Sequence, residues 1–309
     1  MLSLKNIKKY FPIQKGLFKK TVGYIKAVDG VDLTVKNNQV VGIVGESGCG
    51  KSTLARIILR FYTPDTGQIL FKGQDITYLK EMKLKEFRRK VQIVFQDPYS
   101  SLNPKLTIKS TLMDGVRQIY KSREQRLNKI FELLEMVGLD KSSAYKYPHE
   151  FSGGQRQRIC IARAISINPE LIVCDEPVSA LDVSIQAQII NLLIGLKQKM
   201  GLSLIFISHD LNLVGYFCDY TYVMYLGKIV ECAPTDKLFE SPVHPYTKLL
   251  LDSIPGKKKR FSLKKVYNPL DKGKYGCIFS NRCPYVTPRC KEPPILEEIE
   301  SGHKVMCHL

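Results

Sequence analysis

Four short apolar runs along the chain predict buried strands. They cover residues 40–44, 91–95, 171–174 and 204–207, and they are rich in valine, isoleucine and leucine. Short apolar runs that contain β-branched residues and are bounded by turn residues are typical of strands in the interior of a sheet.

The segments between these runs have the spacing of helices. Residues 54–61 and the strongly charged stretch 108–139 are helix-like, and residues 186–200 place apolar side chains at helical intervals. Strands that alternate with helices predict an α/β fold with a parallel sheet covered on both faces.

Length and composition narrow the class of protein. The chain has 309 residues, which predicts about two domains, or one large domain with an appendage. Its 44% hydrophobic and 25% charged residues are ordinary for a globular protein and exclude a wholly disordered or fibrous one. No run approaches the roughly 18 apolar residues of a membrane-spanning helix. The first residues lack the unbroken apolar segment of a secretory signal, so we expect a cytosolic chain unless a membrane component recruits it.

The chain is strongly basic. It holds 47 Lys+Arg against 29 Asp+Glu, a formal net charge of +18. Such a surface predicts anionic partners, whether nucleic acid, acidic lipid or phosphate-bearing ligands. Part of the excess lies after Ser253, where the run Lys257–Arg260 is either a lipid or partner contact or a solvated linker. We place a domain boundary at 255–256.

A glycine-rich loop follows the first predicted strand and precedes a predicted helix. Its residues fit G-x-x-x-x-G-K-[ST]: Gly45, Glu46, Ser47, Gly48, Cys49, Gly50, Lys51, Ser52 and Thr53. Glycines let backbone amides turn toward a phosphate chain, and the helix N-terminus adds partial positive charge. Lys51 would contact the terminal phosphates and Ser52 would bind Mg²⁺. The flanking elements disfavour an incidental glycine-rich turn.

Two acids end the third predicted strand. Buried carboxylates at such a place are costly without a cation, so we expect Asp175 to hold Mg²⁺ through water. Glu176 would act as the general base toward water. The alternative is a strand that merely stops in surface acids.

Residues 151–155, Phe-Ser-Gly-Gly-Gln, precede a helical stretch that Ser152 can cap. Together with the loop, this segment resembles the signature sequence of ATP-binding cassette (ABC) proteins, although Phe151 replaces the commoner leucine. The other family motifs follow in order. Gln96 resembles the Q-loop, residues 179–182 resemble the D-loop with Asp182, and His209 resembles the switch histidine. Tyr10 or Phe11 matches the aromatic that stacks on adenine.

This resemblance implies the fold class and the domains. Residues 1–255 would form an α/β P-loop NTPase (RecA-like) parallel-sheet core with an antiparallel β subdomain and a helical subdomain at approximately 98–158. Residues 256–309 would form a small Cys-rich C-terminal extension.

The resemblance also implies a mechanism shared between two chains. Two ATPs would lie between two cassettes, with Ser152, Gly153, Gly154 and Gln155 of one chain against the nucleotide of the other. Gln96 would contact Mg²⁺ and couple the site to membrane partners, and Glu176, His209 and Gln96 would form the catalytic set. Since the chain holds one set of motifs, it must pair with itself or with a paralogue.

Finer similarities point to one subfamily. Residues 9–13, 94–104 and 244–248, and the tail, resemble the "F"-type ATPases of oligopeptide/dipeptide permeases. The resemblance implies a peptide importer at the cytoplasmic face of the cell membrane. Its partners would be a "D"-type ATPase, two transmembrane permease subunits and an extracytoplasmic substrate-binding protein. Nickel or metal-chelate importers share the subfamily.

Two other classes of function explain less of the sequence. A soluble ABC protein acting on nucleic acid or ribosomes would suit the charge, but it usually carries two cassettes or a coiled-coil insertion, so we expect no nucleic acid partner. A small-molecule kinase would explain the phosphate loop but not residues 152–155.

Four of the nine cysteines lie in the last part of the chain: Cys277, Cys283, Cys290 and Cys307. In a reducing cytosol such a group favours metal binding over disulfides. The spacing departs from the C-x₂-C pairs of common zinc sites, and four thiolates can hold a [4Fe–4S] cluster or Zn²⁺. Resemblance to cluster-bearing members favours [4Fe–4S], with zinc and unliganded thiols as alternatives. The other five are expected to be small buried residues.

Overall fold

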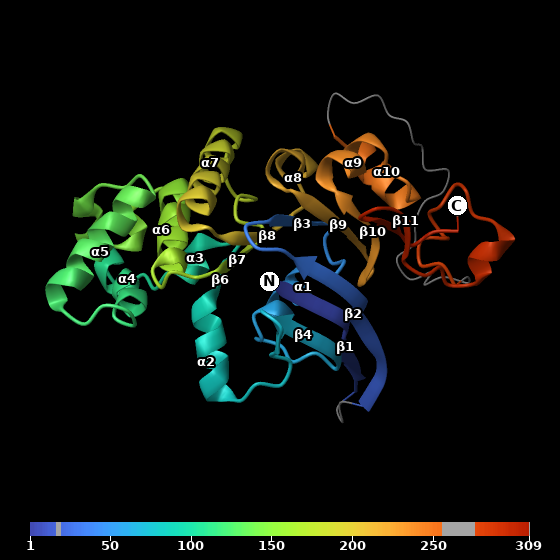
Figure 1. The fold of residues 1–309 in the computed structure, drawn as a ribbon, viewed down its shortest axis with the longest axis horizontal. Helices are drawn as coiled ribbons and strands as arrows, with labels where there is room; N and C mark the ends of the chain where they lie inside the picture. Colours follow the sequence, from blue (N-terminus) through green and yellow to red (C-terminus); the bar gives the residue numbers. More distant parts are fainter. Residues whose placement is uncertain (17–19, 255–275, 309) are drawn as a thin grey trace. The chain divides into compact units, whose positions relative to one another are not determined.

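The structure, a computed structural model, describes residues 1–16, 20–254 and 276–308 (Figure 1). The chain divides into two compact units. Unit 1 is built from residues 1–34, 41–77 and 208–309, and unit 2 from residues 35–40 and 78–207. The predicted domain boundary at 255–256 and the basic run Lys257–Arg260 lie outside the described residues.

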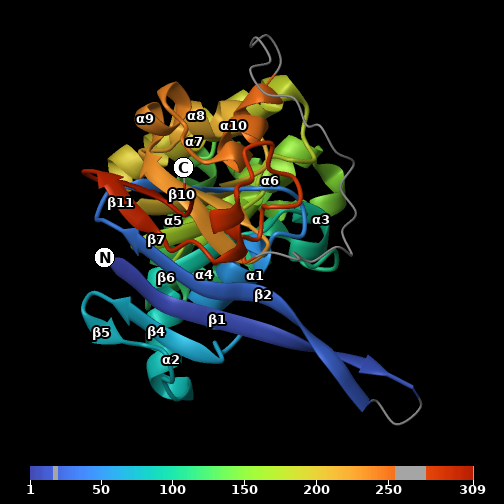
Figure 2. The same ribbon diagram turned by 90° about the vertical axis from the view of Figure 1, so that its right-hand side faces the viewer.

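Unit 1 contains an antiparallel sheet with the strand order β2-β1-β4-β5. The strands are β1 (Leu2–Lys15), β2 (Lys20–Val35), β4 (Thr66–Phe71) and β5 (Gln74–Asp75). Leu2 lies opposite Phe71 and Leu4 lies opposite Ile69, and all four are buried. Alternate residues of β1 therefore supply one apolar face, as the two-residue period of a strand requires. Figure 2 shows the long strands β1 and β2 side by side.

Unit 1 also contains strands that extend from the phosphate loop's own strand. β3 (Val40–Val44) runs parallel to β9 (Tyr220–Tyr225), and antiparallel pairing then continues through β10, β12 and β11. The bounds of these three strands are Lys228–Pro234, His303–Val305 and Glu297–Glu300 respectively. The helices of this unit are α1 (Lys51–Ile58), α8 (Leu211–Phe217), α9 (Thr235–Glu240), α10 (Pro245–Asp252) and the short 3₁₀ helix η3 (Pro288–Lys291).

A buried polar contact joins β12 to the rest of unit 1. The Nε2 atom of His303 lies 2.8 Å from Oε1 of Glu231, a side chain that is 0% exposed. The same carboxylate accepts hydrogen bonds from the backbone N–H groups of Val243 and His244, at 2.8 and 3.0 Å. Three hydrogen-bond partners thereby satisfy the carboxyl group of Glu231, as a buried polar group requires.

Unit 2 is organised around the parallel strands β6 (Val91–Val94), β7 (Leu171–Asp175) and β8 (Ser203–Ser208). Every residue of β7 is buried, which explains its continuous apolar pattern. The helices of this unit are α2 (Glu81–Lys90), α3 (Pro98–Ser101), α4 (Ile108–Val116), α5 (Arg123–Met136), α6 (Gly153–Ile165) and α7 (Val183–Met200), with 3₁₀ helices η1 (Lys141–Tyr145) and η2 (Pro148–Glu150).

The four predicted strands are confirmed as β3, β6, β7 and β8, within one residue at each end. The helical stretch 108–139 is instead two helices, α4 and α5. The break occurs because Ser122 begins a new helix and its hydroxyl accepts the N–H of Gln125 at 3.1 Å. Helix α1 starts three residues earlier than predicted, directly after Gly50. No helix within the described ranges is long and apolar enough to cross a membrane.

Candidate active site

The loop between β3 and α1 depends on glycines with a left-handed backbone. Gly45, Gly48 and Gly50 have φ angles of 153°, 79° and 112°. A Cβ atom on Gly45 would lie 2.2 Å from the carbonyl oxygen of Met224, and one on Gly50 would lie 2.1 Å from that of Ala27. Only glycine therefore lets the loop pack directly against β9 and β2.

Lys51 begins α1, and its ammonium group contacts the backbone of the preceding loop. Its side chain is buried, and Nζ donates to the carbonyl oxygens of Gly45 at 2.7 Å and Glu46 at 3.0 Å. Ser52 and Thr53 are half-buried in the first turn of α1, which contains no acidic residue. The positive end of the helix is thus left for an anion, and the lysine ammonium lies where phosphate oxygens can replace the loop carbonyls.

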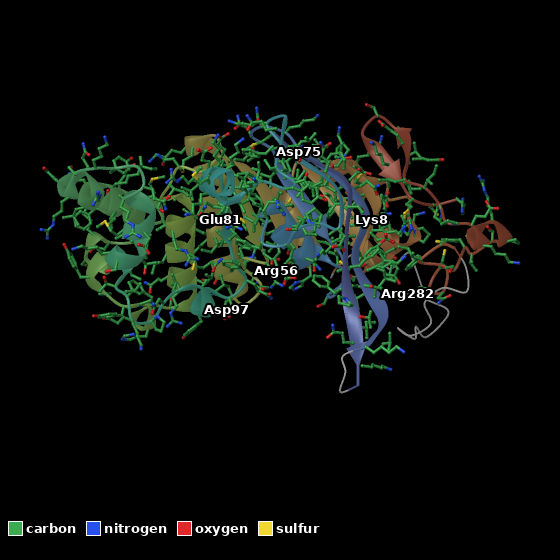
Figure 3. The ribbon with its side chains drawn as sticks, turned by 90° about the horizontal axis from the view of Figure 1, so that it is seen from below. Lys8, Arg56, Asp75, Glu81, Asp97 and Arg282 are labelled. Atoms are coloured by element: carbon green, nitrogen blue, oxygen red, sulfur yellow. The ribbon has the colours of Figure 1, made fainter. Side chains whose placement is uncertain are left out.

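Arg282 and Tyr246, which are distant in the sequence, hold Glu46, the second residue of this loop. The Nη1 and Nη2 atoms of Arg282 each donate to one carboxylate oxygen of Glu46 at 2.8 Å, and the N–H of Glu46 donates to the hydroxyl of Tyr246 at 2.8 Å. Figure 3 labels Arg282 on the C-terminal part of the chain. Sequence reasoning missed both contacts, because the arginine lies 236 residues from its partner.

The predicted acids and the Q-loop glutamine belong to unit 2, and three of its residues meet. Nε2 of Gln96 donates to Oε2 of Glu176 at 3.1 Å and to the hydroxyl of Ser179 at 3.3 Å. Asp175, at the end of β7, is buried. Glu176 has a φ of 49°, a conformation that costs free energy for a residue with a side chain and that is concentrated at functional sites.

The predicted cap of α6 is confirmed. The Ser152 hydroxyl accepts the N–H of Gln155 at 3.3 Å, and the Gln155 side chain accepts the N–H of Ser152 at 3.0 Å. This reciprocal pair is a capping box. Ser152 and Gln155 are exposed and Gly153, the first helical residue, is half-buried. The N-terminus of α6 is thus ordered and accessible to a ligand.

Two contacts fix α6 within unit 2. A Cβ atom on Gly154 would lie 2.6 Å from Cγ2 of Ile185, so glycine permits the close approach to α7, whose N-cap is Asp182. The guanidinium carbon of the buried Arg156 lies 3.7 Å from the ring centroid of Tyr99. Sequence reasoning did not single out this cation–π contact, which joins the helix to the segment after Gln96.

The candidates for adenine stacking differ in how they are held. The Tyr10 hydroxyl donates to Asp29 at 2.5 Å, and burial together with this carboxylate raises the pKa of Tyr10 to about 12. The Phe11 ring meets the Tyr62 ring edge-on, with centroids 5.6 Å apart. His209 follows β8 directly and is exposed. Their roles toward nucleotide stay predictions.

The four C-terminal cysteines line one small pocket with His244 and His308. Burial, and the neighbouring thiols, raise the pKa of Cys283 to about 11, and the pKa of Cys277 is raised for the same reasons. A bound cation would reverse this effect, and thiols are the kind of donor that a four-thiolate group requires. However, the structure has no group of three or more His, Cys, Asp or Glu side chains arranged to hold a metal ion, as far as its described residues go.

The five remaining cysteines are buried, as expected: Cys49, Cys160, Cys174, Cys218 and Cys232. In Cys49, Cys160, Cys174 and Cys232 burial raises the pKa of the thiol, which keeps it protonated and apolar in character.

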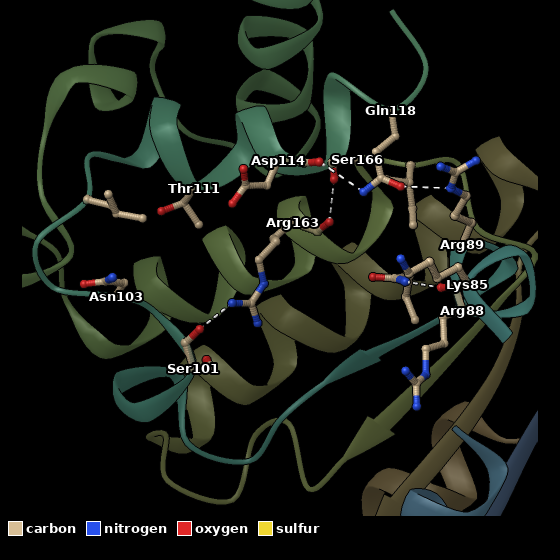
Figure 4. A pocket seen from close by; sticks show the side chains of 14 residues that line it. Lys85, Arg88, Arg89, Ser101, Asn103, Thr111, Asp114, Gln118, Arg163 and Ser166 are labelled. Carbon is tan, nitrogen blue, oxygen red and sulfur yellow. Dashed lines mark hydrogen bonds between the residues drawn. The ribbon is translucent and has the colours of Figure 1, made fainter. Parts of the chain in front are cut away.

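Unit 2 also contains a basic cavity of about 570 Å³ (Figure 4). Its cationic lining residues are Lys85, Arg88, Arg89 and Arg163. Of the residues that line it, Asp114 alone is acidic, and this carboxylate pairs with Arg117 at 3.1 Å. Arg89 is oriented by the neutral Gln118, whose side-chain oxygen it contacts at 2.9 Å. Arg88 pairs with Glu81 of α2 at 4.0 Å, so the excess of positive charge in the cavity comes from Lys85, Arg89 and Arg163.

Comparison with known proteins found matching families, similar proteins and similar solved structures. Residues 28–179 match the ABC transporter family, and residues 230–290 match the C-terminal region of oligopeptide/dipeptide transporters. The chain is 52% identical to the oligopeptide transport ATP-binding protein AppF of Bacillus subtilis (strain 168), over 100% of this chain and 97% of AppF. It is 44% identical to OppF of the same strain, over 99% and 96%. The structure resembles the ATP-binding cassette MJ0796, solved as a dimer bound to ADP and Pi, with a TM-score of 0.68 and 31% identity over 76% of this chain and 99% of that one.

Proposed function

The chain belongs to the ABC transporter family, and on that premise we propose that it is the ATPase subunit of an importer for oligopeptides or dipeptides. Its fold is the ATP-binding cassette fold, a P-loop NTPase with mixed sheets and helices. The observation that carries the proposal is the similarity to oligopeptide transport ATPases along the whole chain, which includes the phosphate loop, the signature segment and the C-terminal region.

In this proposal the residues divide the work of hydrolysis. The loop amides and the N-terminus of α1 bind the phosphate chain, and Lys51 contacts its terminal phosphates. Ser52, Asp175 and Gln96 would hold Mg²⁺, which supplies charge neutralisation on the phosphates when bound. Water attacks the γ-phosphorus, its proton passes to Glu176, and the bond to the ADP oxygen breaks.

The Gln96 hydrogen bond supports this role for Glu176, because it orients the carboxylate before the reaction. His209 completes the catalytic set. Tyr10 or Phe11 would stack on adenine, and Asp182 would lie beside the partner's site.

We further propose that ATP is bound between this chain and a second cassette, a "D"-type paralogue. The exposed and capped start of α6 supports this arrangement, because Ser152 and Gly153 can reach a phosphate bound to another chain. Two permease subunits and an extracytoplasmic binding protein would complete the importer, with this chain at the cytoplasmic face of the membrane.

The basic cavity of unit 2 suits a partner of opposite charge. We propose that it receives an acidic cytoplasmic segment of a permease subunit. Charge complementarity supports this occupant, because the cationic lining is not neutralised by carboxylates of the cavity itself.

Reconstitution tests the proposed function. ATPase activity should rise when the chain is combined with the paralogous ATPase, the permease subunits and a peptide-loaded binding protein in vesicles. RNA or DNA should cause no such increase. Lys51→Ala should abolish tight ATP binding, because the buried ammonium group of the loop is lost. Stimulation by nucleic acid instead of permease subunits, or unchanged nucleotide affinity in Lys51→Ala, would contradict the proposal.

For the cysteine pocket we propose a [4Fe–4S] cluster held by Cys277, Cys283, Cys290 and Cys307. The presence of all four thiols in the lining of one pocket supports it. Protein purified without oxygen should be brown and absorb near ~400 nm, a signature of thiolate-bound iron–sulfur clusters. Colourless protein with stoichiometric zinc would show that the pocket binds zinc instead of a cluster. Colourless protein without metal would show that the thiols are unliganded.

A further inference from the structure

We propose that Arg282 is a positioning residue of the nucleotide site, which neutralises and fixes the carboxylate of Glu46 in the phosphate loop. The inference deepens the proposed function, since it rests on ATP binding at this loop. Arg282 does not belong to any of the nucleotide-site motifs in the sequence, and it comes from the segment that carries the C-terminal cysteines.

Hydrogen bonds hold Glu46 at three groups: its side-chain carboxylate, its backbone N–H and its backbone carbonyl oxygen. Its carboxylate accepts two hydrogen bonds of 2.8 Å from Arg282, the fork geometry that arginine forms with carboxylates. Its N–H donates to Tyr246, and its carbonyl oxygen accepts Nζ of Lys51 at 3.0 Å and the N–H of Cys49 at 3.3 Å. The second residue of the loop is therefore held from outside the loop as well as from inside.

The guanidinium group is itself held in place by packing. It lies 5.8 Å from the ring centroid of Tyr225 and 5.7 Å from that of Phe279, within range of cation–π attraction. Phe279 is 1% exposed and also contacts Tyr246, with centroids 5.6 Å apart. The Arg282 side chain is only 10% exposed, so its contact with Glu46 is partly shielded from solvent. An arginine side chain does not lose its proton in proteins, so Arg282 carries a full positive charge beside Glu46.

The electrostatic reason for the contact is the charge of the ligand. A triphosphate carries several negative charges, and the loop that must bind it contains a carboxylate that is 43% exposed. Without a partner, that carboxylate would repel the phosphates and would be free to adopt other rotamers. Arg282 removes both disadvantages, and it does so without contacting the reacting bond.

The test is the affinity for ATP, measured by titration with a fluorescent ATP analogue and with ATP itself. Arg282→Ala should weaken binding about tenfold, the effect expected from losing hydrogen bonds between charged groups. KM for ATP should rise in parallel, and kcat at saturating ATP should stay within about twofold of the wild type. Arg289→Ala is the matched control, because Arg289 is exposed in the same segment and carries the same charge; it should bind ATP normally.

Two further variants separate charge neutralisation from simple packing. Arg282→Lys keeps the charge without the fork and should fall between wild type and Arg282→Ala. Combining Glu46→Gln with Arg282→Ala removes the bare carboxylate and should restore most of the affinity. Unchanged ATP affinity in Arg282→Ala, or a double variant as weak as the single one, would overturn the inference. A wild-type protein that does not bind ATP would instead refute the proposed function itself.

Discussion

At the scale of single residues, the arrangement around Glu176 is the most informative part of the molecule. The backbone of Glu176 is left-handed, and its carboxylate accepts a hydrogen bond from Gln96. Gln96 also donates to the hydroxyl of Ser179. A strained backbone persists only where its surroundings hold it, and such residues cluster where chemistry is done. The geometry thus agrees with a carboxylate that is held ready to accept a proton.

Glu176→Gln should keep ATP binding and lower hydrolysis by roughly 10²–10⁴-fold, the usual contribution of a general base. Glutamine has the same shape and can keep the contact with Gln96, but it cannot take a proton from water. Phosphate release under single-turnover conditions measures the effect. Glu135 is an exposed acid of α5 that pairs with Lys141 of η1, and Glu135→Gln should leave hydrolysis unchanged. Near-normal turnover in Glu176→Gln would exclude this residue as the base.

At the scale of elements, glycines decide which parts of the backbone approach one another. Gly154 brings the start of α6 against Ile185 of α7, so that the capped end of one helix is fixed by the other. The packing of this pair therefore sets the position of Ser152, which lies two residues earlier.

Gly154→Ala should destabilise the protein by about 1–3 kcal/mol, because the new methyl group would lie 2.6 Å from a side-chain carbon of Ile185. Gly195→Ala is the matched control within α7. Its Cβ would meet no atom within 4 Å, and alanine is the better helix former, so this variant should gain about 0.5–1 kcal/mol. Urea unfolding measures both free energies. Equal stabilities of the two variants would show that the close approach is not tight.

Sequence patterns predicted some elements well and others not at all. Strands β3 and β7 are buried along their whole length, so their continuous apolar runs were sufficient. In each of the long strands β1 and β2, one face is less buried than the other. Both strands also carry many polar residues, so no continuous apolar run marks them. Strands β11 and β12 are short, and their pairing is with each other and, for β12, with β10, so no local apolar pattern marks them.

At the scale of the whole molecule, the site could be predicted only as far as its motifs are local. The phosphate loop and the cap of α6 are encoded by neighbouring residues, and both were predicted. The contact between Arg282 and Glu46 joins residues 236 positions apart, and no local pattern announces it. The basic cavity likewise collects residues of α2, α4 and α6, whose individual charges are indistinguishable in sequence from those of any solvated surface.

Lys85→Glu should reduce the stimulation of ATPase activity by permease subunits about five- to tenfold, because it reverses one charge of the proposed docking cavity. Basal activity should be unchanged, and added salt should weaken the stimulation of the wild type as well. Lys83→Glu, on the same helix but outside the cavity lining, is the matched control. If both variants are stimulated like the wild type, the permease docks elsewhere.

The pair between Glu231 and His303 has an evolutionary consequence. A stop codon before position 303 would remove one hydrogen-bond partner from a carboxyl group that is 0% exposed, a loss of about 1–3 kcal/mol. Shortening this gene by a single mutation would therefore be penalised at once. A shorter descendant would lose less stability if Glu231 had already been replaced by an apolar side chain, so this buried carboxyl group favours one order of the two mutations.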